Sequence, residues 1–379
     1  MDHALAPSDP AAAPADARPG TLTLDGIGHA FGAMRALDDV DLTIAAGELV
    51  AILGPSGCGK STLLRIIAGL LRPQSGRVII DGLDVTALPA NQRSVGIVFQ
   101  SYALFPHMTA AANVGYGLRA RGESRALIAA RVAEMLALVR MGELGARYPA
   151  QLSGGQQQRV AFARTLAVKP GILLLDEPFA ALDRGLRLDM QIEVKRLQRS
   201  LGITTILVTH DQEEALSLAD RVMVLNQGRV EQIAAADEVY ERPASPFVAG
   251  FVGTTNLLKG QLATMPGGGF AVALDDGGTL ALDAAYPCSR AGRVLVAVRP
   301  EQLAIAGGGP INGIVRVLLP LGPNLVVEVA LPDGGALKVG LARGALKAGL
   351  ARDARGPLTP GQPVTIGLAP GERPAVFAA

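Results

Sequence analysis

The sequence predicts an α/β protein with a parallel sheet at its core, a helical subdomain inserted into that core, and a small all-β domain after it. Between residues 21 and about 226, short apolar runs alternate with segments of helical period. Such alternation is typical of a sheet covered by helices. After residue 258, Gly and Pro separate short segments and the helical period fades, which favours a second, β-rich unit.

Continuous apolar runs rich in β-branched residues suit strands that are covered on both faces, as in a parallel sheet. Such runs are Glu48–Leu53, Val95–Phe99, Ile172–Leu175, Thr205–Val208 and Arg221–Leu225. Apolar residues at helical spacing form two stripes, within 128–139 and 186–201. The mostly helical stretch of about 109–160 interrupts the alternation, so we predict that it is an inserted subdomain.

The chain is expected to divide into four segments. Residues 1–20 are rich in Ala, Pro and Asp and lack the basic start of a secretory signal, so we expect a disordered tail. Residues 21–240 form the predicted α/β domain. The Pro-containing stretch 241–258 is predicted to be a linker, and the short strands within 259–379 predict a small β-barrel or sandwich.

Composition excludes several classes of protein. The 379 residues carry a net charge of +1, which gives no global attraction to nucleic acid. No apolar run approaches the roughly 20 residues that span a bilayer. Cys58 and Cys288 are far apart in the sequence and form no disulfide framework, which fits a reducing cytosol. Aromatic residues make up 4% and Trp is absent, so the core must be aliphatic.

Gly54–Ser61 follows a predicted strand and opens a predicted helix, which is the context that a phosphate-binding loop requires. Its glycines let backbone N–H groups turn toward phosphate oxygens, and the helix N-terminus adds partial positive charge. We expect Lys60 to reach the β- and γ-phosphates of a nucleotide, and Ser61 to ligate Mg²⁺.

Polar side chains stand at the ends of three further predicted strands. Asp176 and Glu177 end one strand, and His210 and Gln100 follow two others. Because ligands gather at the carboxyl ends of strands in such sheets, these residues are expected to face one crevice with Lys60. Asp176 is expected to hold Mg²⁺ and Glu177 to position or deprotonate water. Gln100 either contacts Mg²⁺ or water, or is an ordinary polar loop residue.

Leu152–Gln156 (Leu-Ser-Gly-Gly-Gln) precedes a helix that is expected to begin near Gln157. Ser153 is a good N-cap residue. Gly154 and Gly155 leave backbone N–H groups unobstructed at the helix N-terminus, which predicts a second anion site on the same chain. A capping turn without a ligand is the local alternative.

Over about residues 21–240, this ordered set of motifs resembles the ATP-binding cassette ATPases. Gly54–Ser61 resembles their Walker A loop, Leu173–Asp176 their Walker B strand, Leu152–Gln156 their signature and Ala181–Asp183 their D-loop. Ala180 departs from the Ser that the family commonly has. Phe31 is placed like the aromatic that stacks on adenine, although a core phenylalanine fits its position nearly as well.

The resemblance implies an ATPase that uses ATP and Mg²⁺. The implied catalytic residues are Glu177, His210 as the switch histidine, and Gln100 of the Q-loop. The implied nucleotide contacts are Phe31, Gly54, Pro55, Ser56, Gly57, Cys58, Gly59, Lys60, Ser61, Thr62, Ser153, Gly154, Gly155, Gln156 and Asp183. The implied Mg²⁺ ligands are Ser61, Gln100 and Asp176.

The resemblance also implies partners. Family members close two nucleotide domains head to tail, so that the signature of one chain binds the γ-phosphate held by the other. We therefore expect a second copy of this chain or a paralogous ATPase, transmembrane permease subunits and, indirectly, an extracytoplasmic solute-binding protein, with no nucleic acid. The expected location is the cytoplasmic face of the inner membrane.

A narrower resemblance links the chain to importer ATPases for maltose, polyamines, ferric iron, sulfate and phosphonates. It rests on Phe99–Thr109, Thr209–Leu216, Val239–Pro243 and Phe251–Gly253. Their C-terminal domain is an OB-like β fold called TOBE, whose recurring turn Val298–Glu301 resembles. The runs around residues 95–106 favour a polyamine (spermidine or putrescine) or 2-aminoethylphosphonate, with ferric iron, sugar and sulfate as alternatives.

Two other functions fit this sequence less well. A cassette ATPase of DNA repair or translation typically has long coiled coils, zinc cysteines, two cassettes or basic segments, and this chain has one cassette and no Cys-x-x-Cys. An exporter half-transporter would need fused membrane helices. The sequence therefore favours an importer ATPase.

Overall fold

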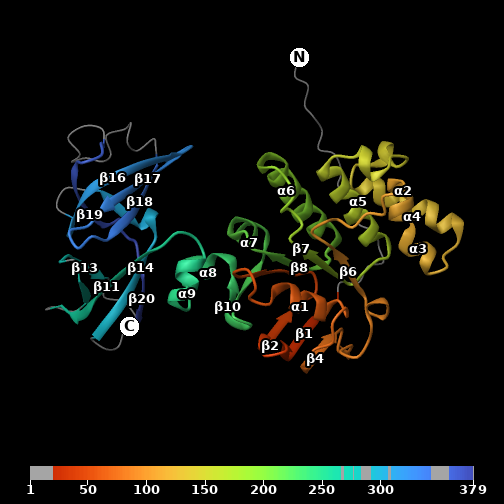
Figure 1. Ribbon diagram of the computed structural model, residues 1–379, viewed down its shortest axis with the longest axis horizontal. Helices are drawn as coiled ribbons and strands as arrows, with labels where there is room; N and C mark the ends of the chain where they lie inside the picture. Colours follow the sequence, from red (N-terminus) through yellow and green to blue (C-terminus); the bar gives the residue numbers. More distant parts are fainter. Residues whose placement is uncertain are drawn as a thin grey trace, which may run out of the picture. The chain divides into compact units, whose positions relative to one another are not determined.

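The computed structural model describes residues 20–265, 269–275, 277–282, 292–305, 309–342 and 358–378. The predicted tail, apart from Gly20, and Cys288 lie outside these residues. The chain divides into two compact units, Met1–Ala236 and Asp237–Ala379. The division falls a few residues before the predicted boundary at 240, and each unit is described by itself (Figure 1).

The first unit is built around a six-stranded sheet in the order β10-β9-β3-β8-β7-β6. Its strands are β3 (Leu49–Leu53), β6 (Val95–Val98), β7 (Ile172–Asp176), β8 (Thr204–Thr209), β9 (Arg221–Asn226) and β10 (Arg229–Ala235). All neighbours pair in parallel except β10, which is antiparallel to β9. Every residue of β3 and β8 is buried. The predicted parallel core is therefore confirmed, with an antiparallel edge that the sequence did not predict.

A second, antiparallel sheet in the first unit was missed. Its order is β2-β1-β4-β5, from β1 (Leu22–Phe31), β2 (Met34–Ile44), β4 (Ser75–Ile80) and β5 (Leu83–Asp84). The pairing of β1 with β2 shifts register three times, and Gly26 has a φ of 60°. Such irregularities break the period of two by which a strand is recognised. One apolar cluster joins both sheets, with Leu22, Val50 and Ile206 among its members.

The helices of the first unit are α1 (Lys60–Ile67), α2 (Ala110–Val114), α3 (Tyr116–Ala120), α4 (Arg125–Leu138), α5 (Gly154–Ala167), α6 (Arg184–Leu201) and α7 (Gln212–Leu218). Short 3₁₀ turns lie at Ala90–Gln92, Gly142–Leu144 and Pro149–Gln151. Helices α2, α3 and α4 pack against α5 and form the predicted helical subdomain (Figure 1). Helix α5 begins at Gly154, earlier than expected, because Ser153 already caps it.

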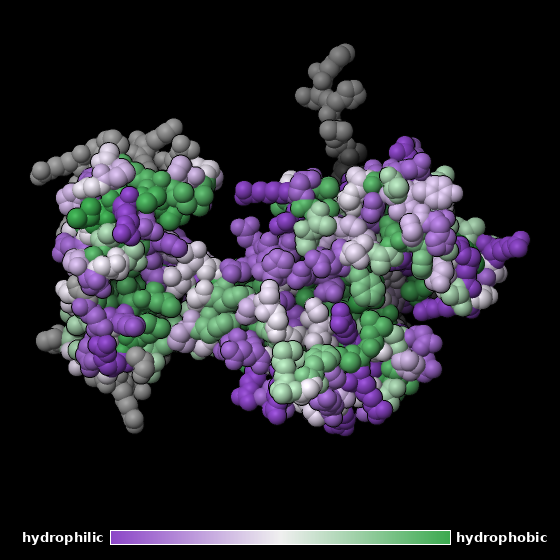
Figure 2. Space-filling model, viewed as in Figure 1, coloured by the Kyte–Doolittle hydropathy of each residue, from purple (hydrophilic) through white to green (hydrophobic). Residues whose placement is uncertain are grey.

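The second unit is all-β after two short helices, α8 (Ala236–Glu241) and α9 (Pro246–Phe251). Its strands are β11 (Asn256–Thr264), β12 (Phe270–Leu274), β13 (Thr279–Leu282), β14 (Gly292–Val298), β15 (Leu303–Ile305), β16 (Ile311–Leu321), β17 (Asn324–Ala330), β18 (Ala336–Ala342), β19 (Pro363–Leu368) and β20 (Ala375–Ala378). They form two antiparallel five-stranded sheets, β13-β12-β11-β14-β20 and β15-β19-β16-β17-β18, with one shared apolar core. A 3₁₀ turn, Pro300–Gln302, joins β14 to β15. Apolar side chains also lie exposed along β16 (Figure 2).

Arg299 fastens the two short helices to the β-sheets of the second unit. The side chain is buried and lies over the ring of Tyr240, with its guanidinium carbon 4.3 Å from the ring centroid. It donates to the carbonyl oxygens of Ala249 and Tyr240, each at 3.0 Å, and to the hydroxyl of Thr255. The segment 241–258, which was expected to be a linker, therefore contains α9 and the start of β11 and is packed within this unit.

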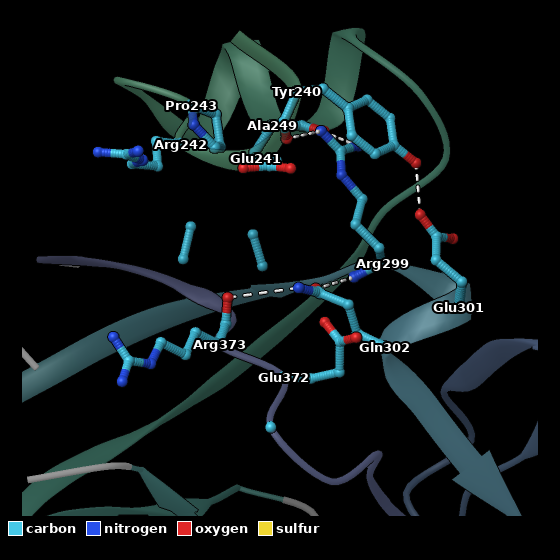
Figure 3. Close-up of a pocket in the computed structure, with 13 residues that line it drawn as sticks. Tyr240, Glu241, Arg242, Pro243, Ala249, Arg299, Glu301, Gln302, Glu372 and Arg373 are labelled. Atoms are coloured by element: carbon cyan, nitrogen blue, oxygen red, sulfur yellow. Dashed lines mark hydrogen bonds between the residues drawn. The ribbon is translucent and has the colours of Figure 1, made fainter. Parts of the chain in front are cut away.

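A cleft of about 670 Å³ opens beside this contact (Figure 3). Tyr240 donates from its hydroxyl to Glu301 Oε1, and Gln302 Nε2 donates to the carbonyl oxygen of Arg373 at 3.3 Å. Burial, followed by the Glu301 carboxylate, raises the pKa of Tyr240 to about 12. The phenol therefore stays protonated and acts as a donor across the neutral pH range.

Candidate functional site

The segment 54–62 connects the end of β3 to the first turn of α1, as predicted for a phosphate-binding loop. Gly59 is the N-cap of α1 with a φ of 110°, and a Cβ at this position would lie 2.3 Å from the carbonyl oxygen of Ala36. Only glycine fits there. No side chain caps α1 and its first turn has no acidic residue. The N–H groups of this helix end are therefore available to an anion.

Lys60 places a positive charge at the same end. Its side chain is buried, and Nζ donates to the carbonyl oxygens of Gly54 at 2.7 Å and Pro55 at 2.9 Å. The neighbouring thiol of Cys58 is buried too, and burial raises its pKa, so the group stays neutral beside the ammonium. One buried ammonium and one uncapped helix end fit the phosphates of a nucleotide.

The structure brings Glu177, Gln100 and His210 together. Glu177 Oε2 accepts from Gln100 Nε2 at 3.2 Å, and Glu177 Oε1 lies 3.1 Å from His210 Nδ1. These residues follow β7, β6 and β8, which are neighbours in the sheet. Glu177 has a φ of 44°, and its N–H donates to the carbonyl oxygen of Val208 at 2.9 Å. The strained backbone and this bond turn the carboxylate toward the other two side chains.

Asp176 is the last residue of β7 and is half-buried. Burial raises the pKa of its carboxyl, the charge of Glu177 raises it further, and the charges of Arg65 and Lys60 oppose both effects. Burial and the Glu177 charge disfavour the ionised form of Asp176, and a bound divalent cation would offset this cost. Ser61 and Gln100 add a hydroxyl and an amide oxygen as hard donors. The predicted set therefore fits Mg²⁺.

The second predicted anion site lies at the N-terminus of α5, and its residues bond to one another. Ser153 Oγ accepts from the N–H of Gln156 at 3.4 Å, and Gln156 Oε1 accepts from the N–H of Ser153 at 2.9 Å. This is a capping box. A Cβ at Gly155 would lie 3.0 Å from Leu186 Cδ1, whereas one at Gly154 would have an ordinary contact, 3.6 Å from Leu182 Cδ2. Gly155 is thus in close contact with Leu186, which would have to shift to admit a larger residue.

Asp183 and Phe31 have positions that refine their predicted roles. Asp183 Oδ1 accepts from the N–H of Leu186 at 3.0 Å and caps α6, a role that an Asp just before a helix could have indicated. Phe31 ends β1 and is 48% exposed, so it is not a core residue. Its ring packs edge-on against His29, with centroids 4.7 Å apart.

Two residues that sequence reasoning missed hold the segment after Gln100. Asn113 is fully buried, and its amide bonds to both backbone groups of Phe105 and to the carbonyl oxygen of Met108. Arg164 donates to the carbonyl oxygens of Tyr102 at 2.9 Å and Ala103 at 2.7 Å. The bonds of Arg164 span 61 and 62 positions, so no local pattern reveals them, whereas those of Asn113 span only 5 to 8.

Comparisons with known proteins give matches to two family models. A family model described as "ABC transporter" matches residues 37–180, and one described as "TOBE domain" matches residues 296–372. The sulfate/thiosulfate import ATP-binding protein CysA of Burkholderia mallei is 49% identical over 330 residues, which cover 85% of this chain and 92% of that protein.

Two more relatives and one solved structure are similar. The spermidine/putrescine import ATP-binding protein PotA of Mesorhizobium japonicum is 47% identical, covering 82% of this chain and 86% of that protein. The Fe(3+) ions import ATP-binding protein FbpC of Agrobacterium fabrum is 45% identical, covering 82% and 88%. The dimeric post-hydrolysis structure of the ATP-binding cassette MJ0796, bound to ADP and Pi, has a TM-score of 0.51 and 36% identity, covering 57% of this chain and 98% of that chain.

None of the helices among the described residues is long and apolar enough to span a membrane. The fold, the motif order and the extent of these matches lead to one family. The chain belongs to the ATP-binding cassette (ABC) transporter family, as an importer-type ATPase with a C-terminal TOBE domain.

Proposed function

We propose that Glu177 is the residue that orients and deprotonates the attacking water during ATP hydrolysis. The observation that carries this proposal is the position of its carboxylate, bonded to Gln100 on one oxygen and beside His210 on the other. Two such contacts fix the orientation of a general base, which is the condition for efficient proton transfer. His210 and Gln100 keep the carboxylate aimed, and Gln100 has an amide oxygen left for water or a cation.

The phosphates of ATP would be held by this chain at the N-terminus of α1. Lys60 would exchange the carbonyl oxygens of Gly54 and Pro55 for phosphate oxygens, and Gly57 and Gly59 would present N–H groups. Ser61, Asp176 and Gln100 would hold Mg²⁺, which neutralises charge on the phosphates when bound. Phe31, exposed at the end of β1, would stack on adenine.

The second part of the proposal is a shared site. Ser153, Gly154, Gly155 and Gln156 would bind the nucleotide held by a second copy of the chain or by a paralogous ATPase, with Asp183 beside them. ATP would close this pair and hydrolysis would reopen it. The dimeric assembly of the MJ0796 cassette supports this arrangement. Transmembrane permeases at the cytoplasmic face of the inner membrane would transmit closure to a solute delivered by a binding protein.

Relatives named for sulfate/thiosulfate, spermidine/putrescine and Fe(3+) match this chain at 49%, 47% and 45% identity. The expected polyamine or 2-aminoethylphosphonate therefore has no advantage in identity over sulfate or iron. We propose import in general as the function. Co-purification of the solute-binding protein with the permease complex, followed by calorimetry with each solute, identifies the cargo.

The decisive experiment replaces Glu177 with Gln, which keeps the shape of the side chain and removes its basicity. Hydrolysis should fall by about 100-fold or more, while nucleotide affinity in a fluorescence titration stays within about threefold, a factor worth under 1 kcal/mol. Glu213→Gln, an exposed glutamate in the first turn of α7, is the matched control. Near-normal turnover by Glu177→Gln would contradict the role of Glu177 as the general base.

A further inference from the structure

The first turn of α6 contacts both of the regions that the proposed function uses. On one side, Leu186 packs so closely on the N-terminus of α5 that a Cβ at Gly155 would lie 3.0 Å from its Cδ1. On the other side, Arg187 Nη1 pairs with Asp211 Oδ2 at 3.3 Å. Arg187 Nη2 also donates to the carbonyl oxygen of Leu182 at 3.3 Å. One guanidinium thus joins the residue before Asp183 to the residue after His210.

Asp211 is itself tied to the strand end that carries His210. Its Oδ1 accepts from the N–H groups of Glu213 at 2.9 Å and Glu214 at 3.2 Å, and its own N–H donates to Thr209 Oγ1 at 2.9 Å. The Thr209 hydroxyl donates in turn to Glu214 Oε2 at 2.7 Å. Both chain neighbours of His210 are therefore fixed by hydrogen bonds, and Arg187 supplies the one described ion pair in this network.

The positive charge of Arg187 also lies near two carboxylates, those of Asp211 and Glu214. Glu214 is buried, and burial raises the pKa of its carboxyl, while the Arg187 charge opposes that change. The Nε of Arg187 is buried and has no hydrogen-bond partner among the described residues. An arginine side chain that made no specific contacts would keep this N–H group hydrated. In Arg187, the Nε loses its hydrogen bond to water while Nη1 and Nη2 bond to Asp211 and Leu182.

We propose that Arg187 is a positioning residue for hydrolysis, which links the turn at Leu182–Asp183 to the strand end that holds His210. This inference rests on the proposed function, because it assumes that His210 aims Glu177. Through Leu186 and Gly155, the same helical turn also reaches the half-site that would serve the second subunit. A movement of the α5 N-terminus when that half-site is filled would therefore reach His210 through α6.

The test is steady-state ATP hydrolysis by the full chain with Arg187→Gln. We expect kcat to fall by roughly 10- to 100-fold, since a small misplacement of a catalytic group costs up to that factor, while the KM for ATP changes by less than about twofold. Arg187→Lys should restore part of kcat, because it returns the ion pair without the fork. Arg184→Gln, an exposed arginine in the same helical turn, should leave both parameters unchanged.

Asp211→Asn gives a second route, since Asn caps a helix as well as Asp but lacks the charge. It should lower kcat as Arg187→Gln does, and the double variant should be no slower than either single variant, because both remove one interaction. Normal kcat for Arg187→Gln, additive losses in the double variant, or a parallel fall in active protein and melting temperature without a split between kcat and KM would each overturn the inference. If Glu177→Gln stays active, the proposed function itself fails, whatever Arg187 does.

Discussion

The N-termini of α1 and α5 were both predicted to bind phosphate, yet the fold builds them differently. Helix α1 begins after Gly59 in the left-handed region, with no side-chain cap and a buried lysine in its first position. Helix α5 begins after Ser153 with a complete capping box formed with Gln156. The first N–H groups of α1 have no side-chain acceptor and are open to a ligand. At the start of α5, the Ser153 and Gln156 side chains already accept from two backbone N–H groups.

This difference assigns the two ends different roles in the proposed cycle. A helix end that is open in the single chain can bind the nucleotide before any partner arrives. An end that is already capped offers fewer N–H groups to an anion, because those of Ser153 and Gln156 are bonded within the capping box. Capped ends are thus suited to a transient contact that must be released after hydrolysis.

The largest expected effect comes from replacing Gly59 at the uncapped N-terminus of α1. In Gly59→Ala, the Cβ would meet the Ala36 carbonyl oxygen at 2.3 Å with φ at 110°. Strain of about 3 kcal/mol corresponds to a loss of about 100-fold in ATP affinity, measured with a fluorescent nucleotide. Gly57→Ala is the control, because its φ is 81° but no atom lies within 4 Å of the Cβ. Equal losses in the two variants would show that the contact with Ala36 is unimportant.

The next prediction concerns the capped end. Ser153→Arg should leave ATP binding to the single chain intact and block ATP-stabilised dimerisation, because a long charged side chain occupies the face offered to the second copy. Size-exclusion chromatography with ATP in the Glu177→Gln background is the measurement. Ser153→Ala should still dimerise, at a cost of about 1 kcal/mol in stability from the lost cap. An ATP-stabilised dimer of Ser153→Arg would contradict the shared site.

Packing against α6 gives a smaller effect at the same end. Gly155→Ala places a Cβ 3.0 Å from Leu186 Cδ1 and Cδ2, so this half-buried side chain must shift by a few tenths of an ångström. We expect the free energy of unfolding to fall by up to about 1 kcal/mol. Gly154→Ala, with its nearest contact at 3.6 Å, should cost less. Adding Leu186→Ala to Gly155→Ala should remove the strain, as urea denaturation would reveal. No difference between the two glycines would refute the packing role.

The smallest effect concerns the carboxylate of Asp176, whose pKa in the folded protein lies above its ordinary value. Ionising it therefore lowers the free energy of unfolding as pH rises from the unfolded pKa of about 3.9. Asp176→Asn should stabilise the nucleotide-free protein by about 1 kcal/mol at pH 7, as is common when a strained functional group is removed, while hydrolysis is lost. The stabilisation should vanish below about pH 4. Equal stability of both proteins at pH 7 would refute this view of Asp176.

Local chemistry made the loops predictable. The strand, glycine loop and helix around Lys60 are contiguous in sequence, and so are the residues that cap α5. The strand ends carrying Glu177 and His210 follow from apolar runs, and the adjacency of β7 and β8 then brings these side chains together. Phe31 could not be placed by pattern, since its exposure depends on what packs around β1.

The remainder depends on contacts between distant residues. The sheet that contains β1 and β2 was not predicted, because shifts of register interrupt the alternation of buried and exposed residues along these strands. The bond between Arg187 and Asp211 joins residues 24 positions apart, which no helical or strand period encodes. Such pairs become visible only when the sheet order is known, because that order decides which loops meet.

The burial of Arg299 has a consequence for how this domain could be exchanged between relatives. Its acceptors lie at Tyr240, Ala249, Thr254 and Thr255, all before β11 begins at Asn256. A chimera joined at 259 would pair the arginine with foreign acceptors, whereas a junction between Ala236 and Asp237 would carry the whole contact along. The unit that can be exchanged intact between relatives therefore begins before the predicted linker at 241–258 and includes α8 and α9.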